Sequence, residues 1–291
     1  MFTDVLIYLF VFLFGLCIGS FLNCAIYRLE QKKSLKGRSF CPHCKHKLSW
    51  QDLFPVFSFL FLKGKCRYCK KSISWQYPIV ELTAGLLFLL IFNFQFFPIA
   101  SLSRILDGYA VGTIFQFLNL IFLFYITSAL IIIFIYDFKH YLIPDKALFP
   151  AIAIAFFYRL FEIFNFGHRD LFGIWSLGFG FFAPLLTYFF AILISSGLFL
   201  LIFLISKGRA MGFGDVKLAV LMGLLLGFPN VLVALFLAFL FGAIIGVILM
   251  VLEKKSLKSE IPFGPFLITG TFMALFWGQQ IINWYLHVFL F

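Results

Sequence analysis

Two aspartates stand beside long apolar stretches, where a charge is unusual. Asp137 directly follows a run of aliphatic and aromatic residues, and Asp215 ends the sequence Met-Gly-Phe-Gly-Asp. Two such carboxylates in one pocket cannot both ionise easily, so one can take a proton from water while the other donates a proton to a peptide carbonyl. That is the chemistry of aspartic proteolysis. Taken alone, an aspartate beside flexible glycines is also typical of an ordinary helix end.

Glycines and a third aspartate accompany this pair. Gly212 and Gly214 lack a Cβ atom, so they let a peptide backbone come close, and either can adopt a positive φ. Asp145 follows a proline shortly after Asp137. Glu81 begins an apolar run, and it either has a structural role or approaches a site. Most of the other carboxylates are expected to be solvated loop charges.

Four cysteines predict a metal site. Cys41 and Cys44 form one C-x-x-C pair, and Cys66 and Cys69 form a second. This spacing is typical of a tetrahedral structural Zn²⁺ site, and the reducing cytoplasm favours thiolate–metal bonds over disulfides. A metal would supply folding energy to a loop that is too short for a large core. Two redox-active pairs are the alternative.

The composition excludes a soluble globular enzyme, a disordered chain and a coiled coil. Of the 291 residues, 63% are hydrophobic and 12% are charged, with a mean hydropathy of +1.05, whereas soluble domains are about 25% charged. The sequence predicts an all-α polytopic membrane protein with about eight transmembrane helices and a small cytoplasmic zinc-binding loop domain. The apolar runs are residues 5–27, 79–98, 111–136, 141–164, 175–205, 211–228, 231–252 and 265–290.

The basic residues predict the orientation. All but three of the 23 Lys and Arg residues lie in loops on one side of the membrane if both termini are outside, and basic loops are typical of the cytoplasmic side. This rule also accounts for the net charge of +11, so no nucleic-acid partner is expected. The predicted organisation is a first transmembrane helix over 1–27, a four-cysteine domain over 28–78 and a seven-helix membrane domain over 79–291.

In this order the motifs resemble the type IV prepilin peptidases, also called prepilin leader peptidase/N-methyltransferases. The resemblance covers almost the whole chain. It rests on Gly19–Asn23 with Arg28-Leu29, both C-x-x-C pairs, Tyr77–Leu82, Asp137 with Pro144-Asp145, Met211–Leu218 and Ile261–Pro265.

The resemblance implies that Asp137 and Asp215 are the catalytic pair of a G-x-G-D aspartic membrane protease. The substrate would be a type IV prepilin or a type II secretion pseudopilin, whose short basic leader is cut at the cytoplasmic face of a bacterial inner membrane. Membrane lipid and the pilus or secretion assembly machinery would be further partners. The supporting residues would be Gly212, Gly214, Asp145 and Lys217.

The resemblance also implies methylation of the new N-terminus with S-adenosylmethionine. Asn23, Gly64 and Glu81 are the residues expected to serve methyl transfer. The cysteine loop favours the bifunctional form, because family members without it look cleavage-only. The sequence itself contains no Gly-rich strand–turn–helix unit for a nucleotide-like cofactor.

Other functions remain open at this point. They are a cleavage-only prepilin peptidase, a proton-coupled transporter with an intramembrane aspartate relay, a presenilin-like protease and a structural platform for pilus assembly. The cysteine pairs and the Pro-Phe-Gly-Pro segment argue against the presenilin-like protease. The lack of broken-helix repeats argues against the transporter, and a platform would not need two aspartates.

Overall fold

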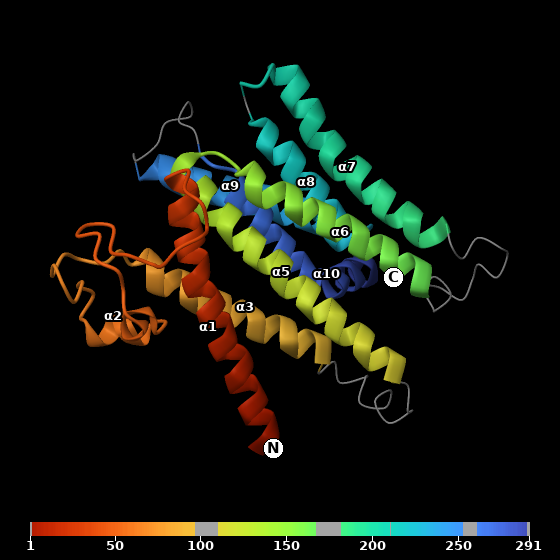
Figure 1. The fold of residues 1–291 in the computed structure, drawn as a ribbon. Helices are drawn as coiled ribbons and strands as arrows, with labels where there is room; N and C mark the ends of the chain where they lie inside the picture. The colour runs from red at the N-terminus through yellow and green to blue at the C-terminus, as the bar shows by residue number, and fades with distance from the viewer. Residues whose placement is uncertain (1, 97–109, 167–181, 210, 253–260, 290–291) are drawn as a thin grey trace. The chain divides into compact units, whose positions relative to one another are not determined.

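The computed structural model describes residues 2–96, 110–166, 182–209, 211–252 and 261–289 (Figure 1). Within these ranges the chain is helical apart from turns, loops and two isolated β-bridges, which confirms the predicted all-α fold. The chain divides into two compact units, Met1–Ile132 (unit 1) and Ile133–Phe291 (unit 2). The organisation expected over 1–27, 28–78 and 79–291 stays a prediction.

Eight helices in the described part of the chain follow the eight apolar runs. Six of them, α1, α3, α5, α6, α7 and α9, are long and apolar enough to cross a membrane. Helix α8 has 14 residues, which is roughly 21 Å at 1.5 Å per residue and less than a hydrocarbon core of about 30 Å. Helix α10 is longer but contains the polar residues Gln279, Gln280 and Asn283. The bounds are α1 Phe2–Glu30, α3 Gln76–Phe96, α5 Ala110–His140, α6 Asp145–Phe166, α7 Phe182–Ser206, α8 Phe213–Leu226, α9 Asn230–Val251 and α10 Gly264–Phe289.

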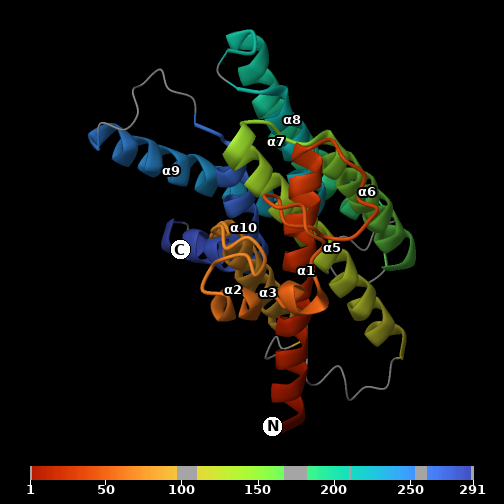
Figure 2. The same ribbon diagram turned by 60° about the vertical axis from the view of Figure 1, so that its left-hand side comes forward.

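In unit 1, α1 crosses α3 at very short range, as both ribbon views show (Figures 1 and 2). A Cβ atom at Gly19 would lie 2.6 Å from the Cα of Glu81, and one at Gly15 would lie 2.7 Å from the Cα of Gly85. Small residues let two apolar helices approach until their backbones touch. The segment between these helices contains the 3₁₀ helix η1 (Trp50–Leu53) and the short helix α2 (Phe57–Phe61).

In unit 2, α8 packs against α6, α7 and α10. Its sequence is apolar on all sides after Lys217, which is typical of a helix that other helices surround. A Cβ atom at Gly223 would lie 2.8 Å from the Cα of Ile192 on α7. The buried Ser195 of α7 donates a hydrogen bond to the Ala219 carbonyl at 2.9 Å. Backbone contact and this hydrogen bond therefore fix α8 against α7.

The carboxyl end of α8 is capped by an arginine from another helix. Arg159 of α6 donates from Nε to the Leu224 carbonyl at 3.1 Å and from Nη2 to the Leu225 carbonyl at 2.7 Å. Its Nη1 lies 2.5 Å from Oε2 of Glu162. A helix end leaves carbonyls without intrahelical partners, and Arg159 supplies donors for two of them.

Candidate active site and metal cluster

Asp137 lies in the last turn of α5 and is buried. Its Oδ2 atom accepts a hydrogen bond from the backbone N–H of Gly264 at 3.1 Å. Gly264 is the first residue of α10, and free N–H groups with a partial positive charge at a helix N-terminus attract a carboxylate. A Cβ atom at Gly264 would lie 2.5 Å from this oxygen, so this approach requires glycine.

Asp215 lies in the first turn of α8 and is also buried. The helix begins two residues before it, after Gly212 at the N-cap position. The Asp215 and Asp137 carboxylates lie close enough to repel each other, although two helices separate α5 from α8 in the sequence. The structure therefore brings the two aspartates of the predicted pair together within unit 2.

The glycines before Asp215 do not use the positive φ that glycine permits. Gly212 is extended with φ −76°, and Gly214 lies inside α8. Their steric role differs as well. A Cβ atom at Gly214 would lie 3.1 Å from the Cβ of Ile143 in the loop before α6, whereas one at Gly212 would approach nothing closer than 3.9 Å. Gly214 thus serves packing, and no atom of the described residues fills the space beside Gly212.

The third aspartate forms an ion pair instead of joining the first two. Oδ1 of Asp145, the first residue of α6, lies 2.8 Å from Nζ of Lys217 on α8. The Asp145 side chain is 55% exposed and that of Lys217 is 24% exposed. The ammonium group also lies 5.1 Å from the ring centre of Phe149 and 5.5 Å from that of Phe213. This pair joins the starts of α6 and α8 next to Asp215.

The four cysteines form a cluster that could hold a metal ion. The sulfur atoms of Cys41, Cys44, Cys66 and Cys69 all lie within 4.8 Å of one another, and those of Cys41 and Cys69 are 4.0 Å apart. Tetrahedral ligation with Zn–S bonds of about 2.3 Å separates the sulfurs by about 3.8 Å. The cluster therefore has the dimensions of a four-thiolate site.

Both C-x-x-C pairs adopt the same knuckle. The Cys41 N–H donates to the His46 carbonyl at 2.9 Å, and the Cys66 N–H donates to the Lys71 carbonyl at 2.8 Å. The residue after each second cysteine, Lys45 or Lys70, has a φ of 60°. The same backbone turn therefore presents the two sulfurs of one knuckle to the two sulfurs of the other.

One of the two thiols in the first knuckle ionises readily. Burial raises the pKa of the Cys41 thiol, but backbone N–H groups of Cys44 and His43 lower it more, and the resulting pKa is about 7. A backbone hydrogen bond from His46 lowers the pKa of the Cys44 thiol, but burial and the neighbouring Cys41 and Cys69 raise it more, to about 11. His46 stacks on Tyr68 with ring centres 3.7 Å apart and is not part of the cluster. Among the described residues, the group that could hold a metal ion therefore consists of the four cysteine sulfurs.

The residues expected to serve methyl transfer are all in unit 1, and two of them connect secondary-structure elements. Asn23 of α1 is buried and donates from Nδ2 to the Tyr77 carbonyl at 3.1 Å. Glu81 of α3 is buried and accepts the Val56 N–H at 2.7 Å. Gly64 lies in the turn after α2 with φ +67°, where a Cβ atom would meet the ring of Phe59 at 3.2 Å. These contacts explain why the fold needs each residue.

The sequence reasoning missed two residues that shape unit 2. Gly264 belongs to the Pro-Phe-Gly-Pro segment, which contributed to the resemblance without a role for its glycine. Arg159 is one of the three basic residues assigned to loops on the outer side, although it lies within the apolar run 141–164. A lone arginine in such a run indicates an internal partner. Its partners, the carbonyls at the end of α8, become visible only in the folded chain.

Fold and site together define a polytopic helical protein with paired buried aspartates and a separate four-cysteine cluster. Residues 13–95 match the bacterial peptidase A24 N-terminal domain, and residues 122–247 match the type IV leader peptidase family. The chain belongs to the type IV leader peptidase family, which confirms the predicted resemblance.

Several similar proteins bear the name prepilin leader peptidase/N-methyltransferase. The protein of Aeromonas hydrophila is 31% identical over 96% of this chain and 94% of its own length. That of Legionella pneumophila is 30% identical with the same coverage, and that of Bacillus subtilis is 30% identical over 96% of this chain and 98% of its own. No solved structure matches the chain.

Proposed function

We propose that this protein is an aspartic endopeptidase of the inner membrane that removes the basic leader from type IV prepilins or type II secretion pseudopilins. The observation that carries the proposal is the pair of buried, electrostatically interacting carboxylates of Asp137, in the last turn of α5, and Asp215, in the first turn of α8. Family membership and the names of the relatives support the substrate class.

The proposed reaction is direct attack by water, without a covalent intermediate. One carboxylate of the pair takes a proton from water while the water oxygen bonds to the peptide carbon, and the other protonates the carbonyl oxygen. The carboxylate that took the proton from water then passes it to the amide nitrogen. The C–N bond breaks as the C=O bond reforms and its hydroxyl proton returns to the other carboxylate. The Gly264 N–H orients Asp137, and the Lys217–Asp145 ion pair positions the first turn of α8. The open space beside Gly212 would admit the substrate backbone.

We further propose that both termini lie outside and that residues 28–78 face the cytoplasm, in agreement with the basic loops. Zn²⁺ bound by the four cysteine thiolates would hold the two knuckles together as a structural ion. Its chemistry there is ligation only, because four protein ligands leave no open position. Within the membrane, the assembly machinery of pili or secretion would be the neighbouring partner.

The second proposed activity is N-methylation of the new N-terminus with S-adenosylmethionine. The relatives carry this activity in their names, and the N-terminal family match, 13–95, includes Asn23, Gly64 and Glu81. Asn23 joins α1 to the start of α3, and Glu81 of α3 holds the loop at Val56. We assign methyl transfer to this part of the chain and cleavage to unit 2.

The test is cleavage of a leader-bearing prepilin in membranes, with mass spectrometry of the new N-terminus. Asp137→Asn and Asp215→Asn should each lower cleavage by about 10³-fold or more, because each removes a proton donor or acceptor. Asp4→Asn, in the first turn of α1, is the matched control and should cleave normally. Processing that persists in either dyad variant would contradict the assignment.

The same spectra separate the remaining functions. A product heavier by one methyl group supports the transferase, whereas unmethylated product leaves a cleavage-only peptidase. No cleavage by the wild-type protein would favour a proton-coupled transporter.

A further inference from the structure

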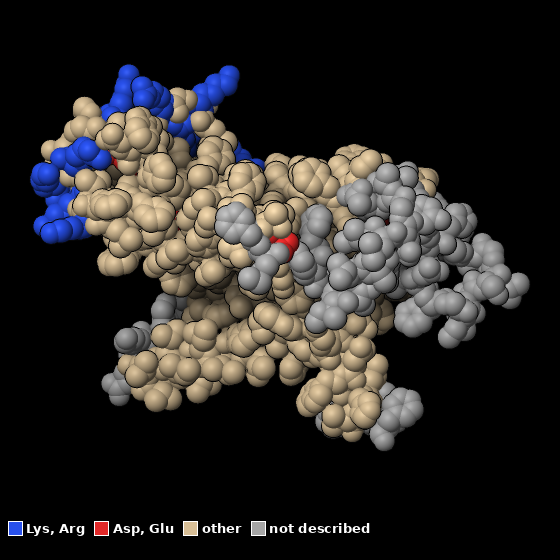
Figure 3. All heavy atoms as spheres, turned by 90° about the horizontal axis from the view of Figure 1, so that it is seen from below, with Lys and Arg blue, Asp and Glu red and all other residues tan. Residues whose placement is uncertain are grey.

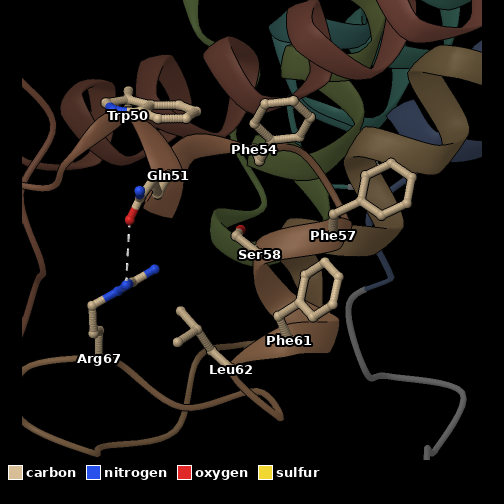
Figure 4. A pocket seen from close by; sticks show the side chains of 8 residues that line it. All are labelled: Trp50, Gln51, Phe54, Phe57, Ser58, Phe61, Leu62 and Arg67. Atoms are coloured by element: carbon tan, nitrogen blue, oxygen red, sulfur yellow. Dashed lines mark hydrogen bonds between the residues drawn. The ribbon is translucent and has the colours of Figure 1, made fainter.

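The loop between α1 and α3 exposes a cluster of aromatic side chains outside any long helix. Trp50, Phe54, Phe57 and Phe61, here called the aromatic face, line a shallow cavity of about 420 Å³ together with Leu62. Figure 4 shows these rings around the cavity, with Trp50 on η1, Phe54 just after it, and Phe57 and Phe61 on α2. Phe61 is 84% exposed and Trp50 is 70% exposed. A contiguous apolar patch of this kind on a polar domain marks an interaction site.

The polar residues around the cavity already have partners. Arg67 donates from Nε to Asp52 at 2.7 Å and from Nη1 to Gln51 at 3.5 Å, the contact drawn in Figure 4. The rest of the lining is aromatic or aliphatic apart from Ser58. This lining fits an apolar chain better than a nucleotide-like cofactor, which needs several convergent polar groups.

The chain places this face close to the membrane surface. The loop leaves α1 at Glu30 and enters α3 at Gln76, and both helices are long and apolar enough to cross a membrane. The Val56 N–H, immediately before α2, donates to Glu81 of α3 at 2.7 Å. Glu81 is five residues into α3, so the start of α2 is fixed roughly 8 Å along that helix from its first residue. An interfacial helix lies about 5–10 Å deep, at the headgroup–acyl boundary.

The charge of the same loop matches an anionic lipid surface. Residues 28–78 contain twelve Lys and Arg residues but only two acidic residues, Glu30 and Asp52. Figure 3 shows the Lys and Arg side chains gathered at one end of the face in view, where this loop lies. Basic residues near an anionic leaflet are attracted to its surface, and aromatic side chains prefer the interface.

We propose that the aromatic face is a membrane-docking surface that inserts at the headgroup–acyl boundary of the leaflet from which α3 starts. Its occupant is anionic phospholipid, with acyl chains against the rings and headgroups against the basic residues of the loop. Arg67 lines the cavity and also lies between Cys66 and Cys69 of the second knuckle. Docking would therefore hold the four-cysteine cluster at a fixed distance from the membrane.

Site-specific photo-crosslinking of the full-length protein in nanodiscs tests the proposal. Benzoylphenylalanine replaces Phe61 or Phe57, and lipid adducts are measured by mass spectrometry. Phe10 on α1, 70% exposed, is the lipid-facing control. Lys47, an exposed position on the first knuckle outside the cavity lining, is the polar control. We expect adducts at both test positions near the Phe10 level and about tenfold above Lys47.

Three results would overturn the proposal. The first is a lipid yield at Phe57 and Phe61 that is no higher than at Lys47 while Phe10 is labelled. The second is crosslinking of the aromatic face to a second copy, to a prepilin or to another part of this chain in place of lipid. The third is equal lipid labelling in phosphatidylglycerol and phosphatidylcholine discs, which would reject the basic residues of the loop as a lipid contact.

Discussion

In the four-cysteine cluster, backbone hydrogen bonds between near neighbours in the sequence shape each pair of ligands, whereas helices far apart in the sequence assemble the Asp137–Asp215 pair. The Cys41 N–H bonds to His46 and the Cys66 N–H to Lys71. Asp137, in contrast, bonds to Gly264 across 127 positions of the chain. Local geometry therefore makes the cysteine knuckles, and helix packing makes the aspartate pair.

This difference determines what each site is sensitive to. Two knuckles without a large core depend on an ion to join them. Loss of a cysteine ligand should therefore destabilise the loop of residues 28–78 and leave helix packing unchanged. The aspartate pair depends on how α5, α8 and α10 meet, so one added methyl group at a helix contact should affect cleavage and leave the metal unchanged. The predictions below test this separation.

Cys44→Ser should have the largest effect, on metal content. Zn²⁺ binding to four thiolates is worth about 10 kcal/mol or more, and three thiolates hold it far less tightly. Zinc analysis of the purified protein should show loss of the ion, and limited proteolysis should show faster cutting within residues 28–78. Prepilin cleavage should persist. Cys17→Ser, at an exposed thiol of α1, should keep its zinc.

Two results would contradict this prediction. A wild-type protein without zinc would reject the site itself. Loss of prepilin cleavage in Cys44→Ser, with the protein still in the membrane, would break the separation between the two sites.

Gly264→Ala should have the next largest effect, on cleavage. The new Cβ atom would lie 2.5 Å from Oδ2 of Asp137, so the carboxylate must move away from the α10 N-terminus. A displacement of about 1 Å at reacting groups can lower the rate by about 100-fold, which kinetics with a prepilin substrate would measure. Zinc content should not change.

The matched control is Gly246→Ala on α9, where a Cβ atom meets nothing within 4 Å. It should cleave at close to the wild-type rate. Equal rates for Gly264→Ala and Gly246→Ala would show that the hydrogen bond from α10 is dispensable.

Arg159→Ala should destabilise unit 2 by about 2 kcal/mol, because the Leu224 and Leu225 carbonyls lose charge-assisted hydrogen bonds. Thermal unfolding in detergent measures the change. The unfolding midpoint of Arg159→Lys should lie between those of the wild type and Arg159→Ala, since an ammonium group cannot reproduce the geometry of the guanidinium fork. An unchanged midpoint in Arg159→Ala would show that the carbonyls at the end of α8 find other partners.

The sequence was sufficient for features that depend on composition or local spacing. The apolar runs predicted the helices, the C-x-x-C spacing predicted the cysteine cluster, and the start of α8 before Asp215 followed from the short length of its run. It was insufficient for the Gly264–Asp137 hydrogen bond and the Arg159 cap, because both depend on how separate helices cross. The backbone conformation of Gly212 was open for the same reason: glycine permits a positive φ, but Gly212 is an extended N-cap at the start of α8.

Asp52→Asn should have the smallest effect, confined to the loop of unit 1. Oδ2 of Asp52 accepts hydrogen bonds from the Ser49 N–H at 3.1 Å and hydroxyl at 2.8 Å, and Oδ1 faces Arg67. Burial raises the pKa of Asp52, but hydrogen bonds from Ser49 and then Arg67 lower it more, so the folded pKa is below its usual value. Such a carboxylate stabilises the fold above its unfolded pKa of about 3.9, and this contribution disappears as the pH falls through the folded pKa.

At pH 7 the variant should therefore be less stable by about 1 kcal/mol, a modest value because the Arg67 partner is partly exposed to solvent. Hydrogen exchange of residues 49–53 measures the difference between wild type and variant. The difference should be constant from pH 7 to about pH 5 and shrink at lower pH, where Asp52 becomes protonated. Loss of zinc at low pH affects both proteins, so the difference between them isolates the carboxylate. A difference that grows as the pH falls would show that protonated Asp52 is the form that holds η1 in place.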